Sequence, residues 1–458
     1  MNVTNPATGK VIGEVPEDTP ETIAAKLEGA RAAQAGWAAV PLEERRARLR
    51  GFRNGLVGCK EDLARRLTAE VGKPIRQSWA ELDAMPARID FFLENVGRVM
   101  EEETVFRDAG KGLEERVAYE PLGVVANISA WNYPYFVGSN VFVPALLTGN
   151  AVLYKPSELA SLTGQAIADL MRDAGVTAGV FTSVFGAGAV AAQLLTHPLD
   201  GVYFTGSHAT GRKVAEAAGR GLMRMQLELG GKDPVYVCED VDLDQAAPSV
   251  AVGAFYNTGQ SCCAVERVYV HERIHDAFVE AFVNTVGAFV VGDPTDETAF
   301  IGPVTRPAQI EVLEAQVEDA RRKGAQVPLG GRRREGPGSW FEPTVVTHVD
   351  HRMELMREES FGPVIGIQKV KGDDEALSLM NDTRYGLTAG VYSRDRERAR
   401  RILSSVRSGS VYWNCCDRVS PRLPWSGRGH SGIGATLGLD GIRAFLQPKA
   451  WHLRAPRA

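Results

Sequence analysis

The chain has 458 residues, 44% of them hydrophobic, 24% charged and 8% aromatic, which is typical of a soluble globular protein with two or three domains. Its 52 basic and 57 acidic side chains leave a net charge of −5, too mild to favour nucleic acid or a membrane surface as a partner. The first ten residues lack the apolar core of a signal peptide, and no apolar run is long enough to span a membrane.

The pattern of residues 20–72 predicts helices, because apolar side chains recur near helical spacing until a Gly and Pro stop signal at 71–74. A second helical stretch is expected over about 77–101. Between 114 and 230, short runs rich in β-branched residues alternate with helical windows. These runs are Gly123–Ser129, Ala151–Lys155, Val180–Phe185, Val202–Thr205 and Met225–Leu229. Strands separated by helices predict a Rossmann-like, doubly wound parallel sheet with ligands at the carboxyl ends of its strands.

A further α/β segment is expected from about 231 onward. Its helices are expected near 243–257, 272–289 and 307–323, and its strands near 341–346 and 362–369. The Gly- and Arg-rich stretch 330–338 is expected to be an exposed loop.

The six cysteines, at positions 59, 238, 262, 263, 415 and 416, include two adjacent pairs. Adjacent pairs are an awkward basis for disulfides, and the His and Cys spacings match no zinc pattern. We therefore expect a reducing, cytoplasmic location, no metal site, and a chemical rather than structural role for any special cysteine.

Glycines follow two of the predicted strands. Gly186 follows the strand 180–185, and the strand 202–205 runs into Gly206 and Gly211. Glycine after a strand allows backbone N–H groups to approach a phosphate closely, but tight packing explains such glycines equally well.

A third loop, after the strand 151–154, adds Lys155 and Glu158. A cation and an acid at a strand end could bind the two hydroxyls of an adenosine ribose, and the acid would repel a 2′-phosphate, which favours NAD over NADP. The alternative is a surface turn that opens a helix.

Two groups suggest covalent chemistry. Cys262 or Cys263 lies on a Gly-containing turn between a predicted helix and the strand 267–270, where a thiol could face a cleft. The alternative for either cysteine is a small buried hydrophobe. Glu228 ends an apolar strand and precedes two glycines, and burial there would raise its pKa toward the range of a general base. A structural carboxylate is the alternative.

Seven motifs in order resemble those of the aldehyde dehydrogenase superfamily over nearly the whole chain. They are Ala130-Trp-Asn-Tyr-Pro134, Lys155-Pro-Ser-Glu158, Phe204-Thr-Gly-Ser207, Glu228-Leu-Gly-Gly-Lys232, Gly259-Gln-Ser-Cys262, Glu359-Ser-Phe-Gly-Pro363 and Ser431-Gly-Ile-Gly434. The resemblance implies an NAD-dependent enzyme that oxidises an aldehyde to the carboxylic acid. Cys262 would form a thiohemiacetal and then a thioester, Asn132 and the backbone N–H of Cys262 would hold the oxyanion, and Glu228 would activate the hydrolytic water.

The resemblance also assigns binding residues. For the cofactor it implies Trp131, Lys155, Glu158, Gly186, Gly206, Ser207, Gly211, Leu229, Glu359 and Phe361. For the substrate it implies Tyr133, Val137, Asn140, Arg418, Arg422 and Trp425. Either arginine could pair with the carboxylate of a semialdehyde, although a solvated loop arginine is the alternative. The aromatic residues equally suit an apolar aldehyde.

The chain departs from the common pattern after Gly434, where it has Ala435-Thr436 instead of Arg-Glu, and in the segment 424–428. These departures are not expected to touch the chemistry, but they leave the subfamily open. A semialdehyde-specific enzyme such as a succinate-semialdehyde dehydrogenase is one alternative, and a CoA-acylating enzyme is another, disfavoured by the presence of Glu228. A cysteine hydrolase lacks a matching His motif, and a non-catalytic protein would be expected to have lost Cys262, Glu228 or Asn132.

The resemblance finally implies a division of the chain. An NAD-binding domain would comprise 1–101 and 121–230, a catalytic α/β domain 231–440, and a small bridging β element 102–120 and 441–458. Through this oligomerisation element the protein would form a homodimer or homotetramer.

Overall fold

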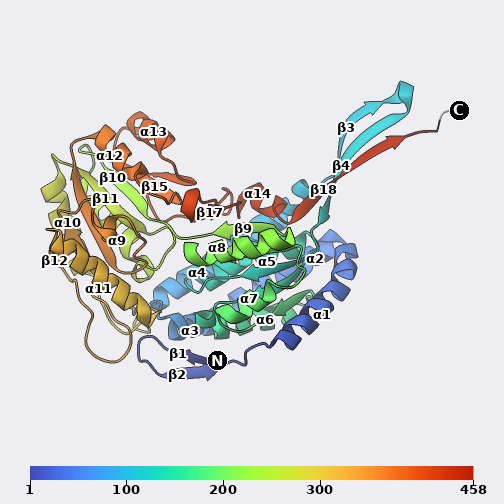
Figure 1. Cartoon of the computed structure of the whole chain (residues 1–458), viewed down its shortest axis with the longest axis horizontal. Helices are drawn as coiled ribbons and strands as arrows, with labels where there is room; N and C mark the ends of the chain where they lie inside the picture. The colour runs from blue at the N-terminus through green and yellow to red at the C-terminus, as the bar shows by residue number, and fades with distance from the viewer. Residues whose placement is uncertain (457–458) are drawn as a thin grey trace.

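Two large sheets and one projecting antiparallel sheet organise residues 1–456, which are the residues described by the structure, a computed structural model (Figure 1). A short hairpin of β1 (Asn2–Thr4) and β2 (Val11–Glu14) forms a fourth sheet near the amino terminus. Within these residues, no helix combines the length and the apolar character needed to cross a lipid bilayer. The expected α/β fold class is confirmed.

The first large sheet contains five parallel strands in the order β9-β8-β5-β6-β7, and β17 pairs antiparallel with β9 at the edge. The strands are β5 (Val124–Ile128), β6 (Ala151–Lys155), β7 (Phe181–Ser183), β8 (Gly201–Thr205), β9 (Arg224–Glu228) and β17 (Gly432–Ile433). The five parallel strands predicted between 114 and 230 are therefore all present. The edge strand β17 was not predicted, because two residues carry no periodicity.

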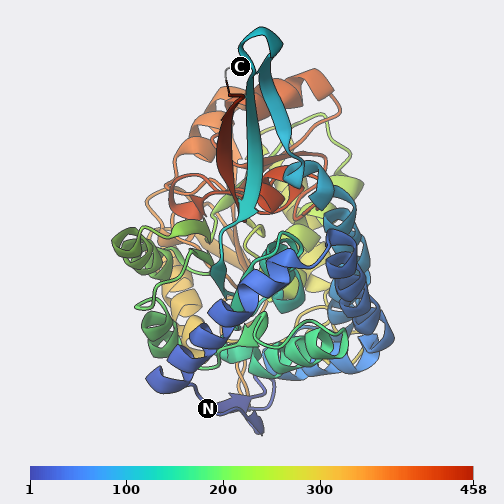
Figure 2. The same ribbon diagram turned by 90° about the vertical axis from the view of Figure 1, so that its right-hand side faces the viewer.

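Helices cover both faces of this sheet (Figures 1 and 2). They are α1 (Pro20–Ala39), α2 (Leu42–Gly58), α3 (Lys60–Val71), α4 (Ile75–Met100), α5 (Pro134–Leu147), α6 (Ser161–Asp173), α7 (Gly188–Leu194) and α8 (His208–Gly221). Alternate strand residues pack into different cores: Val202 lies with α1, α7 and α8, and Tyr203 with α2, α4 and α5. A parallel sheet is expected to be buried on both faces in this way.

The second large sheet follows the order β12-β13-β14-β11-β10-β15-β16, with only β12 antiparallel to its neighbour. Its strands are β10 (Asp233–Val237), β11 (Val265–His271), β12 (Gln326–Leu329), β13 (Thr344–Thr347), β14 (Val364–Val370), β15 (Thr388–Tyr392) and β16 (Ser410–Trp413). Its helices are α9 (Leu243–Phe255), α10 (His275–Gly287), α11 (Pro307–Arg322), α12 (Asp373–Asn381) and α13 (Arg396–Ser405). The helices predicted for this segment are present, and 330–338 is an exposed loop as expected.

The third sheet projects from the rest of the chain (Figures 1 and 2). It consists of β3 (Glu103–Asp108), β4 (Leu113–Pro121) and β18 (Leu446–Arg454), in the order β18-β4-β3. The register of β4 and β18 runs over nine residue pairs, from Pro121 with Leu446 to Leu113 with Arg454. The strand pair expected near 103–120 and the contribution of the tail 448–454 are thus present, whereas the division into functional domains stays a prediction.

Candidate active site

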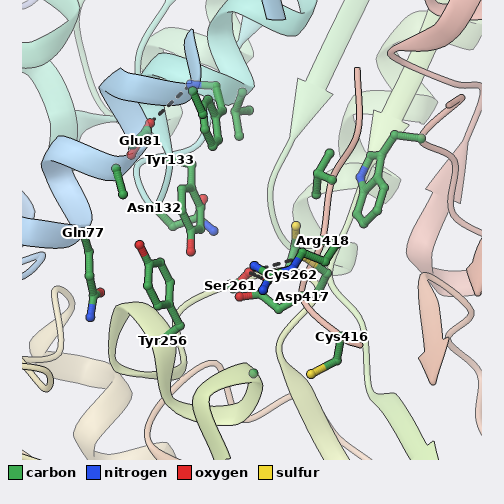
Figure 3. Close-up of a pocket in the computed structure, with 18 of the residues that line it drawn as sticks. Gln77, Glu81, Asn132, Tyr133, Tyr256, Ser261, Cys262, Cys416, Asp417 and Arg418 are labelled. Atoms are coloured by element: carbon green, nitrogen blue, oxygen red, sulfur yellow. Dashed lines mark hydrogen bonds between the residues drawn. The ribbon is translucent and has the colours of Figure 1, made fainter. Parts of the chain in front are cut away.

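A cavity of about 610 Å³ is lined by segments from both large sheets (Figure 3). The carboxyl ends of β8 and β9 contribute Thr205 and Glu228. The rest of the lining comes from helices α4, α5 and α9, the loop of Asn132 and Tyr133, the segment 256–263 that carries Cys262, and the segment 416–425. The three residues predicted to be catalytic, Cys262, Glu228 and Asn132, therefore face the same cavity although they are remote in the chain.

An unusual turn presents Cys262 to this cavity. After α9, the residues Asn257, Thr258 and Gly259 have φ values of 53°, 58° and 72°, in the left-handed region. Neighbouring segments hold the turn: the Asn257 N–H donates to Gln77 Oε1 at 2.8 Å, and the Thr258 hydroxyl donates to the Gly302 carbonyl at 3.3 Å. A side chain at Gly259 would collide with the Gly362 carbonyl. Such conformations persist only where the surroundings over-determine them, and here they set the position of the cysteine.

The two adjacent cysteines are not equivalent. Cys262 is half-buried, whereas Cys263 is 4% exposed and its thiol donates to Asp417 Oδ1 at 3.1 Å. A hydrogen bond with Cys262 and burial raise the pKa of Cys263 well above its usual value. The structure thus favours Cys262 as the reactive thiol of the pair.

Asn132 lies just beyond β5, beside the cysteine turn. Its Nδ2 donates one proton to the Gln260 carbonyl at 3.0 Å, and its own backbone carbonyl accepts from Asn257 Nδ2 at 3.2 Å. Its second amide proton has no acceptor among residues 1–456. The side chain is 4% exposed, so this amide is a fixed donor beside the thiol.

Glu228, the last residue of β9, is held by two side chains. Its Oε1 accepts from Gln226 Nε2 at 2.9 Å and from the Thr436 hydroxyl. Burial raises the pKa of Glu228 to about 7, against the opposing effect of these hydrogen bonds. Thr436, a departure that was expected not to touch the chemistry, thus contacts the predicted base, because the antiparallel pairing of β17 with β9 brings this part of the chain to Glu228.

A second cavity, of about 710 Å³, begins at the amino end of α8 and contains two residues predicted to bind the cofactor, Ser207 and Glu359. The Ser207 hydroxyl caps α8 by accepting from the Thr210 N–H. Glu359 accepts from the Gly231 N–H at 3.1 Å, and burial raises its pKa to about 8. The Gly206 N–H donates to the Glu228 backbone carbonyl at 3.0 Å, so the turn before α8 adjoins the catalytic residues.

Glu266 fixes the loop after Glu359. Its carboxylate accepts from the backbone N–H groups of Ser360 and Phe361 at 2.9 and 3.0 Å. Phe361 has a φ of 46°, and its ring meets the ring of Trp131 edge-on with centroids 5.6 Å apart. These two aromatic residues, both predicted to bind the cofactor, are therefore in contact.

Lys155 and Glu158 lie side by side at the carboxyl end of β6. The buried Lys155 Nζ donates to the Pro156 carbonyl at 3.1 Å and lies 3.6 Å from Glu158 Oε2, and burial lowers the pKa of this lysine. Glu158 also begins a 3-10 helix, Glu158–Ala160. The loop is therefore both a cation–acid pair at a strand end and a turn that opens a helix. The pair has the chemistry needed to bind ribose hydroxyls.

The predicted glycines pack tightly against side chains. A Cβ at Gly211 would lie 2.5 Å from a methyl group of Leu229, and one at Gly206 would lie 2.5 Å from the ring of Phe204. Gly186 has a φ of 150°, and a Cβ there would collide with Val190. Close packing accounts for these three glycines, and the N–H groups of Gly206 and Gly211 already donate to backbone carbonyls.

Of the residues predicted to bind the substrate, Tyr133, Val137, Asn140, Arg418 and Trp425 line the first cavity. Arg422 does not, because the turn at 420–423 exposes its side chain to solvent. Sequence reasoning missed Gln77, Glu81 and Arg88, which line the cavity from one face of α4. Their helical spacing was a usable signal, but polar side chains on a helix ordinarily indicate a solvated face.

Comparison with known proteins decides the family. The model of the Aldehyde dehydrogenase family matches residues 1–451. The chain belongs to the aldehyde dehydrogenase family.

Other aldehyde dehydrogenases resemble this chain over nearly its whole length. It is 36% identical over 457 residues to the peroxisomal aminoaldehyde dehydrogenase 2 of Malus domestica, covering 98% of this chain and 91% of the relative. It is 37% identical over 446 residues to the succinate-semialdehyde dehydrogenase [NADP(+)] of Deinococcus radiodurans, covering 97% and 93%. The crystal structure of an NAD-dependent aldehyde dehydrogenase from Sinorhizobium meliloti has a TM-score of 0.96 and 34% identity, covering 100% of this chain and 92% of that one.

Membership of the aldehyde dehydrogenase family confirms the predicted family and reaction class. The protein is an NAD(P)-dependent oxidoreductase that acts on aldehydes. The roles of individual residues, the choice between NAD and NADP, the aldehyde and the number of subunits stay predictions.

Proposed function

We propose that this aldehyde dehydrogenase oxidises its substrate to the free carboxylic acid, with Cys262 as nucleophile, Glu228 as general base and NAD as the preferred cofactor. The observation that carries the proposal is the shared cavity, to which remote segments contribute a half-buried thiol, a fixed amide donor and a carboxylate with a pKa of about 7. Those three groups are what covalent oxidation followed by hydrolysis requires.

In the first step, the Cys262 thiolate bonds to the carbonyl carbon of the aldehyde. The carbonyl oxygen becomes an oxyanion, which the free amide proton of Asn132 and the backbone N–H of Cys262 stabilise. NAD, when bound, would supply the oxidant. The C–H bond of the thiohemiacetal breaks, its hydrogen leaves as a hydride with both electrons, and the oxyanion closes to a carbonyl. Cys262 then carries a thioester.

In the second step, Glu228 takes a proton from a water molecule as the water oxygen attacks the thioester carbon. The carbon–sulfur bond breaks, the acid leaves, and the Cys262 thiolate is restored. With a pKa of about 7, a large fraction of Glu228 is ionised near neutral pH and able to accept that proton. The presence of this base supports water rather than CoA as the acyl acceptor.

Lys155 and Glu158 support NAD binding at the adenosine end. They fit a ribose with two free hydroxyls, and the half-exposed Glu158 carboxylate would repel a 2′-phosphate. At the nicotinamide end, Glu359 would hold the second ribose, with Trp131 and Phe361 beside it.

The decisive experiment measures the burst of reduced cofactor. Wild-type enzyme and Cys263→Ser are expected to form about one equivalent of NADH per active site, whereas Cys262→Ala forms none. A burst in Cys262→Ala would contradict the role of this thiol. Formation of NADH only in the presence of CoA would contradict the hydrolytic reaction.

The assembly and location belong to the same proposal. The projecting sheet of β3, β4 and β18 would bridge subunits of a homodimer or homotetramer, which sedimentation of the wild-type protein tests. The six cysteines are all unpaired, which supports a reducing cytoplasmic location.

A further inference from the structure

Arg88 is a buried cation in the lining of the active-site cavity. It lies on the face of α4 that also presents Gln77 and Glu81, and its side chain is 3% exposed. No step of the proposed mechanism uses this residue. Arginine stays protonated in proteins, so α4 carries a full positive charge to the cavity.

The contacts of Arg88 leave that charge unpaired. Its Nη1 donates to Asn140 Oδ1 at 2.8 Å, and its guanidinium carbon lies 4.2 Å from the centre of the Phe136 ring. Its Nε has no hydrogen-bond acceptor. Within residues 1–456, no carboxylate lies within ion-pairing distance of Arg88, and its Nη2 has no acceptor either. A buried charge without a counter-charge is costly, so its retention calls for an explanation.

The nearest carboxylates, Glu81 and Glu228, are already bound by other groups. Glu81 accepts from Lys73 Nζ at 2.5 Å and from two backbone N–H groups at the start of α5. Glu228 accepts from Gln226 and Thr436. Both stabilise the Arg88 cation from a distance, but burial dominates and lowers its pKa to about 10, which leaves it charged at neutral pH.

Asn140 adds a second unused donor beside Arg88. Its Oδ1 accepts from Arg88 Nη1, so its Nδ2 is turned away from the guanidinium, and Nδ2 donates to no residue among 1–456. Asn140 also lines the cavity. Two neighbouring side chains therefore offer N–H groups to the cavity, one of them charged, with no acceptor on the protein.

We propose that Arg88 and Asn140 bind a carboxylate of the aldehyde substrate, which makes the substrate an ω-oxo carboxylic acid. A carboxylate has two oxygens to accept these donors and the negative charge that Arg88 lacks. A substrate with a protonated amine would instead be repelled by Arg88, while Glu81 on the same helix face is neutralised by Lys73. The inference rests on the proposed function, since it names the substrate class of the same cavity.

Matched pairs of aldehydes test this inference. The panel is 4-oxobutanoate with butanal, 5-oxopentanoate with pentanal, and 4-aminobutanal, each assayed for kcat and KM. The wild-type enzyme is expected to favour the carboxylate of each pair at least 50-fold in kcat/KM. Arg88→Met is expected to lower kcat/KM for the carboxylate about 100-fold, chiefly through KM, and to lower it far less for the uncharged partner. Arg88→Lys, which keeps the charge, should restore part of the preference.

Arg98→Met is the matched control, because Arg98 is an exposed residue of the same helix. A binding readout without turnover comes from alkylation of Cys262: succinate is expected to slow alkylation of wild-type enzyme but not of Arg88→Met, and butyrate to slow neither. Thermal unfolding identifies a variant that fails to fold, in which case Arg88→Lys and Asn140→Leu carry the test.

The outcomes separate the two proposals. If Cys262→Ala still gives a burst of NADH, or if NADH forms only with CoA, the proposed function fails. If it oxidises butanal as well as 4-oxobutanoate, only the carboxylate inference fails. An equal loss for both members of a pair in Arg88→Met, with a shifted pH profile of kcat, would overturn the inference in favour of a positioning role exerted through Glu228.

Discussion

The hydroxyl of Thr436 donates a hydrogen bond to the carboxylate of Glu228, across 208 positions of the chain. Thr436 lies two residues after the motif Ser431-Gly-Ile-Gly434. The hydrogen bond favours the ionised carboxylate and opposes the effect of burial. A residue outside the shared motifs thus lowers the pKa of the proposed base against the larger effect of burial.

Replacement of Thr436 by Val is expected to raise the pKa of Glu228 above its present value of about 7, because a hydrogen bond to the charged form is lost. Only the ionised form of Glu228 accepts a proton, so the ascending limb of the rate of thioester hydrolysis against pH should move to higher pH. At pH 7 the ionised fraction, and with it the rate, should fall about threefold, for a lost hydrogen bond worth about 1 kcal/mol. Single-turnover hydrolysis from pH 5.5 to 9 measures this, with Thr436→Ser as the control. An unmoved limb would show that the hydroxyl does not act on Glu228.

Replacement of Glu228 by Gln should separate the two halves of the reaction. The side chain keeps its size and can still bond to Thr436 and Gln226, but it can no longer accept a proton. We expect the burst of NADH to persist while steady-state turnover falls about 10²–10⁴-fold. Stopped-flow absorbance resolves the two phases. A lost burst with a normal fold would mean that Glu228 acts before hydrolysis.

Replacement of Asn132 by Ala removes the proposed oxyanion donor. The burst rate should fall about 10²–10³-fold. Folding should be little affected, because Asn257 Nδ2 also donates to the Gln260 carbonyl, at 3.1 Å, and keeps it satisfied. Burst kinetics and thermal unfolding are measured on the same preparation. An unchanged burst rate would mean that Asn132 does not stabilise the oxyanion and that backbone donors do so alone.

Replacement of Glu158 by Gln tests the cofactor preference. Without its charge the residue no longer repels a 2′-phosphate, while the neighbouring Lys155 cation, whose Nζ lies 3.6 Å from Glu158 Oε2 in the wild-type chain, remains to attract one. The ratio of kcat/KM for NADP to that for NAD should rise at least tenfold. If the wild-type enzyme already prefers NADP, the role given to Glu158 is wrong.

Replacement of Glu81 by Gln tests stability. Lys73 and Glu81 form an ion pair with both side chains fully buried, so the change leaves the Lys73 cation uncompensated. We expect a loss of about 3–5 kcal/mol, seen as a lower midpoint of denaturation by urea. The double variant Lys73→Met, Glu81→Leu should be more stable than Glu81→Gln. The opposite order would mean that the pair contributes little.

The first large sheet could be predicted well because its strands are apolar runs bounded by helices with clear periodicity. The strand Asp233–Val237 was missed, since its opening Asp and Pro are typical of a turn. In the structure, the Asp233 carboxylate accepts from the Thr388 hydroxyl of β15, a partner that no local pattern reveals.

The catalytic residues could be predicted because they lie in motifs with fixed spacing. Arg88 could not, because an arginine on a helix is ordinarily solvated. Its burial comes from Asn140 and Phe136 on a different helix. Arg422 is the reverse case. Its guanidinium could bind a carboxylate, but it lies on a turn that faces solvent.

The pairing of β17 with β9 bears on how the chain is made. Gly432 and Ile433 complete the edge of a sheet whose other strands end by residue 228, so a nascent chain has synthesised more than nine-tenths of its length before that edge can close. Contacts of such sequence separation form late and slowly. During translation the backbone of β9 on that side therefore has no strand partner until residues 432 and 433 have been made.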